Sequence, residues 1–492
     1  MNLATAFNES VQANPDKTAV FWGDEQFSYG RLHAQSLWIR NQLKQLGIKA
    51  GDRVALWLKN CPQFIPALVG VWQADAVVAP VNNFLKPEEV TYILGDAGIE
   101  VVITDSSMAD GAAKLSALQP NLKFIQIEHM PEKGVADDQE APGSRDESDL
   151  AVIIYTSGTT GRPKGAMMTH GNLLHNVASC REVLRAVGED RFVVVLPMFH
   201  SFMLTVGILL PLSVSGSILL IKSLHPPKNI IQDVVQNRAT ILPAVPQFFR
   251  TLMHPSVPAQ LPLRLCISGG APLPGEILRE FSTKFPFPLV EGYGLSEASP
   301  VVTFNPLDRQ KAGSIGKAIP HVEVSVQADD GTLLPAGQTG EICVRGGNVM
   351  QGYWNQPAET AKCMRDGWLL TGDVGHVDDE GYYFITDRKK DMLLVNGINV
   401  YPREIEEVLY KFAGVKEAAV IGVPDARKGE QPMAFVAPHD GATLDEKAIL
   451  HFVREKLADY KVPRRVVTVD SLPRNATGKV LKTALRQMAT QQ

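Results

Sequence analysis

Short apolar runs alternate with segments of helical length through the first two thirds of the chain. The runs cover residues 53–57, 76–80, 100–104, 192–196 and 263–267, and they are rich in valine, isoleucine and leucine. Buried strands have this composition. Because strands that alternate with helices usually pair in parallel, the pattern predicts an α/β fold with mainly parallel sheets.

The last third of the chain has a different pattern. Residues 322–386 contain short alternating strands separated by Asp-Gly and Glu-Gly turns, which predict a small antiparallel β-subdomain. A charged cluster at residues 387–391 separates these strands from a further pattern of helices and strands. We therefore predict a large N-terminal domain, residues 1–388, and a small mobile α+β C-terminal domain, residues 389–492.

Composition narrows the classes of partner and compartment. A net charge of -5 provides no general basic field, which argues against nucleic acid as the main partner. The five cysteines are widely spaced without a C-x-x-C pair, as expected of reduced thiols. The first residues lack the basic and apolar regions of a secretory signal, so we expect a cytoplasmic protein.

One uncharged stretch, residues 202–221, is long enough to span a bilayer. Gly207, Pro211 and several serines within it favour a buried helix followed by a strand at residues 217–221. Peripheral membrane contact through another surface is left open.

The segment YTSGTTGRPKG at residues 155–165 has the composition of an anion-binding loop. It follows an apolar strand-like run, residues 150–154, and precedes an expected helix start at residues 172–177. Glycines turn backbone N–H groups toward an anion, while hydroxyls and a lysine add donors and positive charge. The order G-x-x-x-x-G-K-[ST] is absent, which excludes a Walker A motif. The alternative is a surface loop that binds nothing. The expected phosphate-binding residues are Thr156, Ser157, Gly158, Thr159, Thr160, Gly161 and Lys164.

The ordering of this loop resembles the phosphate-binding motif of the adenylate-forming superfamily. That superfamily comprises acyl-CoA synthetases, peptide-synthetase adenylation domains and luciferases. Further motifs of the superfamily follow in its order across nearly the whole chain, and together they identify the chain as a member. These motifs are PMFHS at 197–201, SGGAP at 268–272, EGYGLSE at 291–297, GEICVRG at 340–346, GWLLTGD at 367–373, Asp387-Arg388, NGINVYP at 396–402 and PRNATGK at 473–479.

The resemblance implies a reaction in two steps. A carboxylate displaces pyrophosphate from ATP to give an acyl adenylate, and a thiol then displaces AMP to give a thioester. Mg²⁺ offsets the triphosphate charge, and coenzyme A is the expected thiol because no carrier domain follows Lys479 in this sequence.

The resemblance also assigns nucleotide-binding roles. Tyr293 is expected against the adenine, Asp373 and Arg388 at the ribose, and Glu297 with Thr156 at the metal. Each has a simpler alternative: a packed tyrosine, an aspartate that caps a turn, or a solvated glutamate. The remaining residues expected at the nucleotide are Gly269, Gly270, Ala271, Glu291, Gly292, Gly294 and Ser296.

Four residues are expected to serve the two steps. By resemblance, Lys479 bridges the substrate carboxylate and the α-phosphate, and Lys390 is the hinge about which the C-terminal domain rotates. His200 resembles the gate between the acyl pocket and the pantetheine tunnel, and Gly397 lets the pantetheine arm pass. The simpler interpretations are surface lysines and a histidine at the edge of the core.

The expected acyl pocket is mostly apolar and offers no charged partner, which disfavours amino acids. A medium- or long-chain fatty acid is the first choice by resemblance, and an aryl or cinnamate-type acid is the second. Two further hypotheses stay open, namely an enzyme that loads a carrier protein and a non-catalytic nucleotide-binding or membrane-associated protein. The expected pocket residues are His200, Ser201, Phe202, Thr205, Ile267, Gly292 and Ala298.

Overall fold

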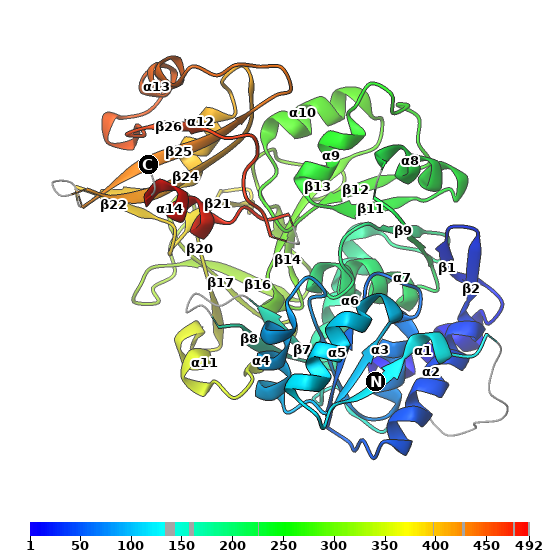
Figure 1. Ribbon diagram of the computed structural model, residues 1–492. Coiled ribbons are helices and arrows are strands. Elements are labelled where there is room, and N and C mark those ends of the chain that lie inside the picture. Colours follow the sequence, from blue (N-terminus) through cyan, green and yellow to red (C-terminus); the bar gives the residue numbers. More distant parts are fainter. Residues whose placement is uncertain are drawn as a thin grey trace.

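Two large sheets form most of the chain, with two smaller sheets toward its C-terminal end (Figure 1). The predicted α/β architecture with mainly parallel sheets is confirmed. The computed structural model describes residues 1–132, 143–156, 162–224, 226–396, 398–425, 429–475 and 478–490.

The first large sheet has seven strands in the order β18-β8-β7-β4-β3-β5-β6. Its inner parallel strands β3, β4 and β5 are mostly apolar and buried, and helix α3 (Phe64–Gln73), which is buried along its whole length, packs beside β3 and β4. The strands are β3 (Arg53–Trp57), β4 (Val77–Pro80), β5 (Val101–Thr104), β6 (Lys123–Gln126), β7 (Leu150–Thr156), β8 (Lys164–Thr169) and β18 (Gly352–Tyr353).

The second large sheet has nine strands in the order β15-β14-β13-β12-β11-β9-β10-β1-β2. Helices α8 (Pro227–Gln236), α9 (Pro246–Leu252) and α10 (Gly275–Lys284) supply an apolar cluster that covers one face. The strands are β1 (Thr18–Trp22), β2 (Glu25–Ser28), β9 (Arg191–Val194), β10 (Ser217–Leu220), β11 (Ile241–Ala244), β12 (Leu265–Ser268), β13 (Leu289–Gly294), β14 (Val301–Phe304) and β15 (Lys317–Ala318).

Helix α6 (His170–Leu184) contributes to the apolar core that both large sheets share. Its first turn is capped because the Thr169 hydroxyl accepts from the Asn172 N–H and the Asn172 side chain accepts from the Thr169 N–H. The helix therefore begins directly after β8. The sequence pattern indicated this helix but missed the strand before it.

The uncharged stretch at residues 202–221 lies inside this core. It forms a π-helix, Met203–Leu209, then α7 (Leu210–Ser213) and then β10. The predicted buried helix followed by a strand is confirmed. Among the described residues, none of the helices combines the length and apolarity that a bilayer crossing requires.

A five-stranded antiparallel sheet follows, in the region where the sequence predicts one. Its long strand β20 carries Asp373, which pairs with Arg388 of β21. The expectation that Asp373 lies at a turn is therefore wrong. The preceding Gly372 adopts φ of 72°, and the register shifts beside it, so this residue forms a bulge inside the strand. The strands are β16 (Val322–Gln327), β17 (Gly340–Gly346), β19 (Met364–Arg365), β20 (Trp368–Val377) and β21 (Tyr383–Arg388).

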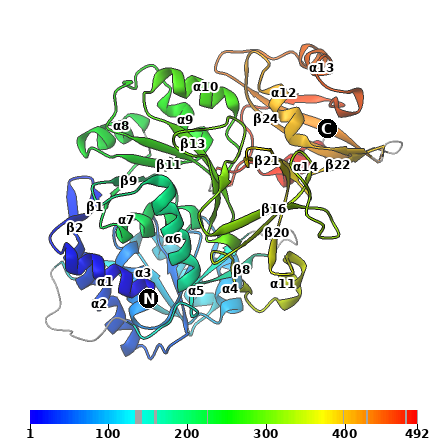
Figure 2. The same ribbon diagram turned by 180° about the vertical axis from the view of Figure 1, so that it is seen from behind.

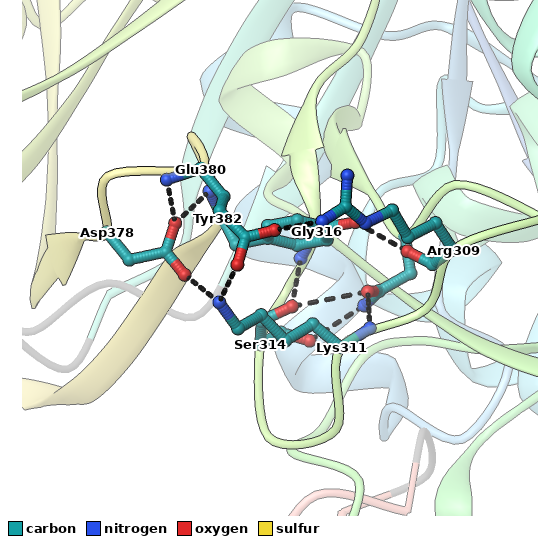
Figure 3. A network of polar contacts seen from close by, with 8 residues as sticks. Arg309, Lys311, Ser314, Gly316, Asp378, Glu380 and Tyr382 are labelled. Carbon is teal, nitrogen blue, oxygen red and sulfur yellow. Dashed lines mark hydrogen bonds and ion pairs between the residues drawn. The ribbon is translucent and has the colours of Figure 1, made fainter.

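The loop after β14 connects the turn of the β20–β21 hairpin to β13. The Lys311 ammonium group pairs with the carboxylates of Asp378 and Glu380 (Figure 3). The Lys311 N–H donates to Asn305 Oδ1 at 3.1 Å, and Asn305 Nδ2 donates to the Glu291 carbonyl at 3.3 Å. This network joins the antiparallel sheet to the second large sheet.

The C-terminal part is an α+β unit with its own apolar core (Figure 2). Its helices carry apolar residues at helical spacing, and the two long strands β24 and β25 pair along their length. The elements are β22 (Leu393–Val395), β23 (Ile398–Val400), α12 (Pro402–Leu409), β24 (Val415–Asp425), β25 (Gly429–Pro438), α13 (Glu446–Arg454), β26 (Val466–Thr468) and α14 (Lys482–Thr490).

Candidate functional site

A cavity of about 630 Å³ lies where the two large sheets, the antiparallel sheet and the C-terminal unit meet. The carboxyl ends of β7, β12 and β13 open into it, which is where ligands bind in parallel α/β sheets. The cavity brings together sixteen of the expected site residues: Thr156, Lys164, His200, Ser201, Phe202, Ile267, Gly269, Gly270, Gly292, Tyr293, Gly294, Ser296, Glu297, Arg388, Lys390 and Lys479.

Other expected residues lie elsewhere. The Thr205 side chain is fully buried and donates to the Ser299 carbonyl at 2.9 Å, and Ala298 is fully buried, so neither belongs to the cavity wall. Ala271 is also outside the wall. The expected residues Ser157, Gly158, Thr159, Thr160, Gly161 and Gly397 lie outside the described residues.

The β7–β8 hairpin positions the phosphate-binding candidates. Thr156 and Lys164 are paired across its two strands, so their side chains start from one end of the hairpin. Lys164 forms an ion pair with Glu359, and its ammonium group lies 5.2 Å from the centre of the Tyr353 ring. Gly165 lies inside β8, where a Cβ would come within 2.7 Å of Ile153, so close packing requires this glycine. That role differs from the expected one of turning the loop.

Glu297 offers a carboxylate oxygen at the cavity wall. Its Oε1 accepts a hydrogen bond from the Tyr353 hydroxyl at 2.8 Å, which leaves the second oxygen for a hard cation. The described residues contain no group of three histidine, cysteine, aspartate or glutamate side chains that could enclose a metal. One carboxylate with phosphate oxygens is the usual donor set for Mg²⁺. The residues present therefore fit Mg²⁺ that is bound together with a nucleotide.

A second polar group at the cavity consists of Tyr293, Asp373 and Arg388, which are joined by polar contacts. The Tyr293 hydroxyl donates to Asp373 Oδ2 at 2.6 Å, and Arg388 Nε lies 3.0 Å from Asp373 Oδ1. Burial, followed by the Asp373 charge, raises the pKa of Tyr293, so the phenol stays protonated. Asp373 itself is buried directly behind Tyr293 and Arg388 and is outside the described cavity wall.

Glu291 is also behind the wall. Its carboxylate accepts from the Leu273 N–H at 3.0 Å, and burial raises its pKa to about 7 against the opposing charge of Arg403. Arg403 belongs to α12, so its charge acts on Glu291 from the C-terminal unit. Glu291 therefore supports the end of β13, and a direct nucleotide contact finds no support in this position.

His200 and Lys479 come from distant parts of the chain and both line the cavity. Burial, followed by the positive charge of Lys479, lowers the pKa of His200 to about 4, so the imidazole is neutral at pH 7. His200 Nδ1 accepts from the Phe202 N–H at 3.3 Å, which places the ring proton on Nε2.

Lys479 reaches the cavity from the loop before α14. Solvent reaches the Lys479 side chain, and the cavity wall partly buries it. This burial, followed by the charge of Arg388, lowers the pKa of Lys479 to about 8. The ammonium group therefore remains mostly charged at pH 7 and can neutralise an anion.

Lys390 lies in the turn between β21 and β22, beside Lys389. The Lys389 N–H donates to the Gly372 carbonyl at 2.8 Å, and its ammonium group lies 2.8 Å from Glu341 Oε2. Burial, followed by the Arg388 charge, lowers the pKa of Lys390. The turn lies between β21 of the antiparallel sheet and β22 of the C-terminal sheet.

The apolar part of the wall was largely missed by sequence reasoning. Its residues come from α6, the π-helix, β12 and β14, and they are spread over residues 180–304, a range that no motif spans. They include Cys180, Val183, Leu184, Val206, Val301 and Phe304.

The fold and the motifs have matches among known proteins. The model of the AMP-binding enzyme family matches residues 7–354, and that of the AMP-binding enzyme C-terminal domain matches residues 404–479. A feruloyl-CoA synthase of an Amycolatopsis species is 37% identical over 484 residues, which are 97% of this chain and 97% of that protein. A long-chain-fatty-acid–CoA ligase of Bacillus subtilis (strain 168) is 34% identical over 531 residues, with 99% and 95% covered.

Solved structures agree with this assignment. ATP-bound MatB from Rhodopseudomonas palustris superposes with a TM-score of 0.91 at 35% identity, and the match covers 99% of each chain. The chain belongs to the AMP-binding enzyme family, with the adenylate-forming fold, and is an AMP-forming acid–thiol ligase that uses ATP, Mg²⁺ and coenzyme A.

Proposed function

We propose that this ligase converts a medium- or long-chain fatty acid into its coenzyme A thioester. The observation that carries the proposal is that charged side chains line one part of the cavity wall and apolar side chains line another. The charged side chains of the described wall all come from the β7–β8 hairpin, the turn after β13, the segment 388–390 and the C-terminal loop. The wall from α6, the π-helix and β14 is apolar, which suits an uncharged acyl group.

The proposed roles at the nucleotide belong to residues in or directly behind the charged part of the cavity wall and to the backbone beside it. Lys164 binds the phosphates, and Glu297 with Thr156 serves the metal. Tyr293 lies against the adenine, and Asp373 with Arg388 binds the ribose. The backbone at the ends of β12 and β13 lines the nucleotide through Gly269 and Gly270 after β12, Gly292 and Gly294 in β13, and Ser296 after it.

We further propose that Lys479 acts on the reacting carboxylate. Its charged ammonium group neutralises the charge that builds as the carboxylate oxygen attacks the α-phosphorus. His200, as a neutral ring, separates the acyl wall formed by Ser201, Phe202 and Ile267 from the path of the thiol. When bound, Mg²⁺ supplies Lewis-acid stabilisation of the phosphate oxygens.

The domain boundary is proposed at residues 388 and 389, with Lys390 as the hinge. The end of β21 and the start of β22 belong to different sheets, which supports this position. Gly397 is proposed to border the pantetheine arm after rotation about the hinge.

An aryl or cinnamate-type acid is the second candidate, and the feruloyl-CoA synthase relative favours it. A substrate panel separates the two. Octanoate, palmitate, cinnamate, ferulate and a polar dicarboxylate are each incubated with ATP, Mg²⁺ and coenzyme A, and the thioester is measured by mass together with AMP release. We expect the fatty acids to give the highest kcat/KM; a preference for ferulate would replace the first candidate by the second.

A further inference from the structure

Tyr353 contacts both of the groups proposed to serve the metal and the phosphates. Its hydroxyl donates to Glu297 Oε1 at 2.8 Å, and the Lys164 ammonium group lies 5.2 Å from its ring centre. Tyr353 also lines the cavity. No motif singled out this residue, because it lies 189 positions after Lys164 and 56 after Glu297.

The backbone around Tyr353 is attached on two sides. Tyr353 pairs with Ala166 of β8, and the next residue, Trp354, donates its N–H to the Gly165 carbonyl at 2.7 Å. The Tyr353 N–H donates to Thr360 Oγ1 at 2.8 Å. The ring is therefore fixed relative to the strand that carries Lys164.

The same segment also holds the backbone of Glu297. The Met350 N–H donates to the Glu297 carbonyl at 2.9 Å, so the residue is bound at its main chain and at its carboxylate. A hydrogen bond to one carboxylate oxygen limits rotation of the group and directs the other oxygen. Burial, followed by the Glu297 charge, raises the pKa of Tyr353, so the hydroxyl keeps its proton and remains a donor.

We propose that Tyr353 is a positioning residue for the metal and phosphate end of the site. Its hydroxyl orients the Glu297 carboxylate toward the divalent cation, and its ring face holds the Lys164 ammonium group beside the phosphates. This inference rests on the proposed roles of Glu297 and Lys164. The inference adds Tyr353 as a residue that positions the side chains of Glu297 and Lys164.

Calorimetric binding of α,β-methylene ATP, with and without Mg²⁺, tests the hydroxyl. We expect Tyr353→Phe to bind the analogue normally without Mg²⁺. The increase in its affinity on adding Mg²⁺ should be about tenfold smaller than in the unchanged chain. Tyr383→Phe is the matched control, because the Tyr383 hydroxyl donates to the Val324 carbonyl at 2.6 Å, outside the cavity wall. This variant should retain the full gain.

The role of the ring is tested by pyrophosphate binding. Tyr353→Phe keeps the aromatic face and should bind pyrophosphate as the unchanged chain does, whereas Tyr353→Leu should bind it about threefold more weakly. Equal affinities of the two variants would overturn the role of the ring.

Two further results would overturn the inference. One is a full Mg²⁺-dependent gain in Tyr353→Phe, and the other is an equal loss with and without Mg²⁺, which a general structural defect would cause. In a double-mutant cycle, Glu297→Gln should abolish the gain, and adding Tyr353→Phe should then change nothing. If the unchanged chain does not bind the analogue at all, the proposed nucleotide site itself fails.

Discussion

Two basic side chains of the cavity hold different charges at neutral pH, because burial and neighbouring positive charges lower the pKa of each from a different ordinary value. His200 is neutral with a pKa of about 4, and Lys479 is mostly charged with a pKa of about 8. A neutral imidazole does not compete with the lysine for the carboxylate. Of these two side chains, Lys479 therefore carries the positive charge.

Removing this charge should separate binding from chemistry. We expect Lys479→Ala to retain ATP binding and to lose most of its adenylation rate, because the ammonium group acts on charge that develops during attack. Pyrophosphate release and nucleotide binding are measured in the same preparation. An unchanged rate of pyrophosphate release would remove Lys479 from the mechanism.

The lowered pKa of Lys479 also predicts a pH dependence. The charged form exists below pH 8 and is lost as the pH rises through about 8, well before an ordinary lysine would lose its proton. The kcat/KM for adenylation should therefore fall above pH 8. In Lys479→Arg this alkaline fall should disappear, because a guanidinium group stays charged. A fall at the same pH in that variant would assign the titration to another group.

Glu291 predicts a pH-dependent stability. Its folded-state pKa is about 7, above the ordinary 4.5, so its contribution to stability is present below pH 4.5 and is lost as the pH rises through 7. Glu291→Gln keeps an acceptor for the Leu273 N–H without the charge. We expect this variant to gain roughly 3 kcal/mol relative to the unchanged chain between pH 4.5 and pH 8. Parallel melting-temperature profiles of the two proteins would contradict this.

At the scale of elements, the β20–β21 hairpin is held by the loop after β14. Asn305 is the buried centre of this loop: it donates to the Ser314 carbonyl at 2.8 Å and accepts from the Lys311 N–H at 3.1 Å. The hairpin carries Asp373 and Arg388, so the loop also orients the ribose-binding candidates.

The loop makes a stability prediction. Asn305→Ala leaves buried backbone groups without partners and should lower the free energy of unfolding by about 1–3 kcal/mol. Lys311→Met removes the partly exposed ion pairs shown in Figure 3 and the contact of the ammonium group with the Tyr382 ring, and it should have a much smaller effect. Denaturant unfolding of the two variants compares them. An equal loss would mean that the surface charges hold the hairpin.

At the scale of the whole molecule, the cavity exists only where three sheets and loops of the C-terminal unit meet. The motifs that line it lie on different sheets, and the loop before α14 adds Lys479 from near the far end of the chain. Because the motifs that line the cavity belong to different sheets, no single sheet contains the site.

The sequence by itself determined the α/β architecture, the buried helix and strand at residues 202–221 and the family, because hydrophobic periodicity and ordered motifs are local in the chain. The tertiary structure decided that Asp373 lies in a bulged strand, that Glu291 and Thr205 are behind the wall, and that Tyr353 contacts Glu297 and Lys164. These positions depend on contacts between residues far apart in the sequence. Periodicity carries no information about such contacts, whereas packing of the sheets determines them.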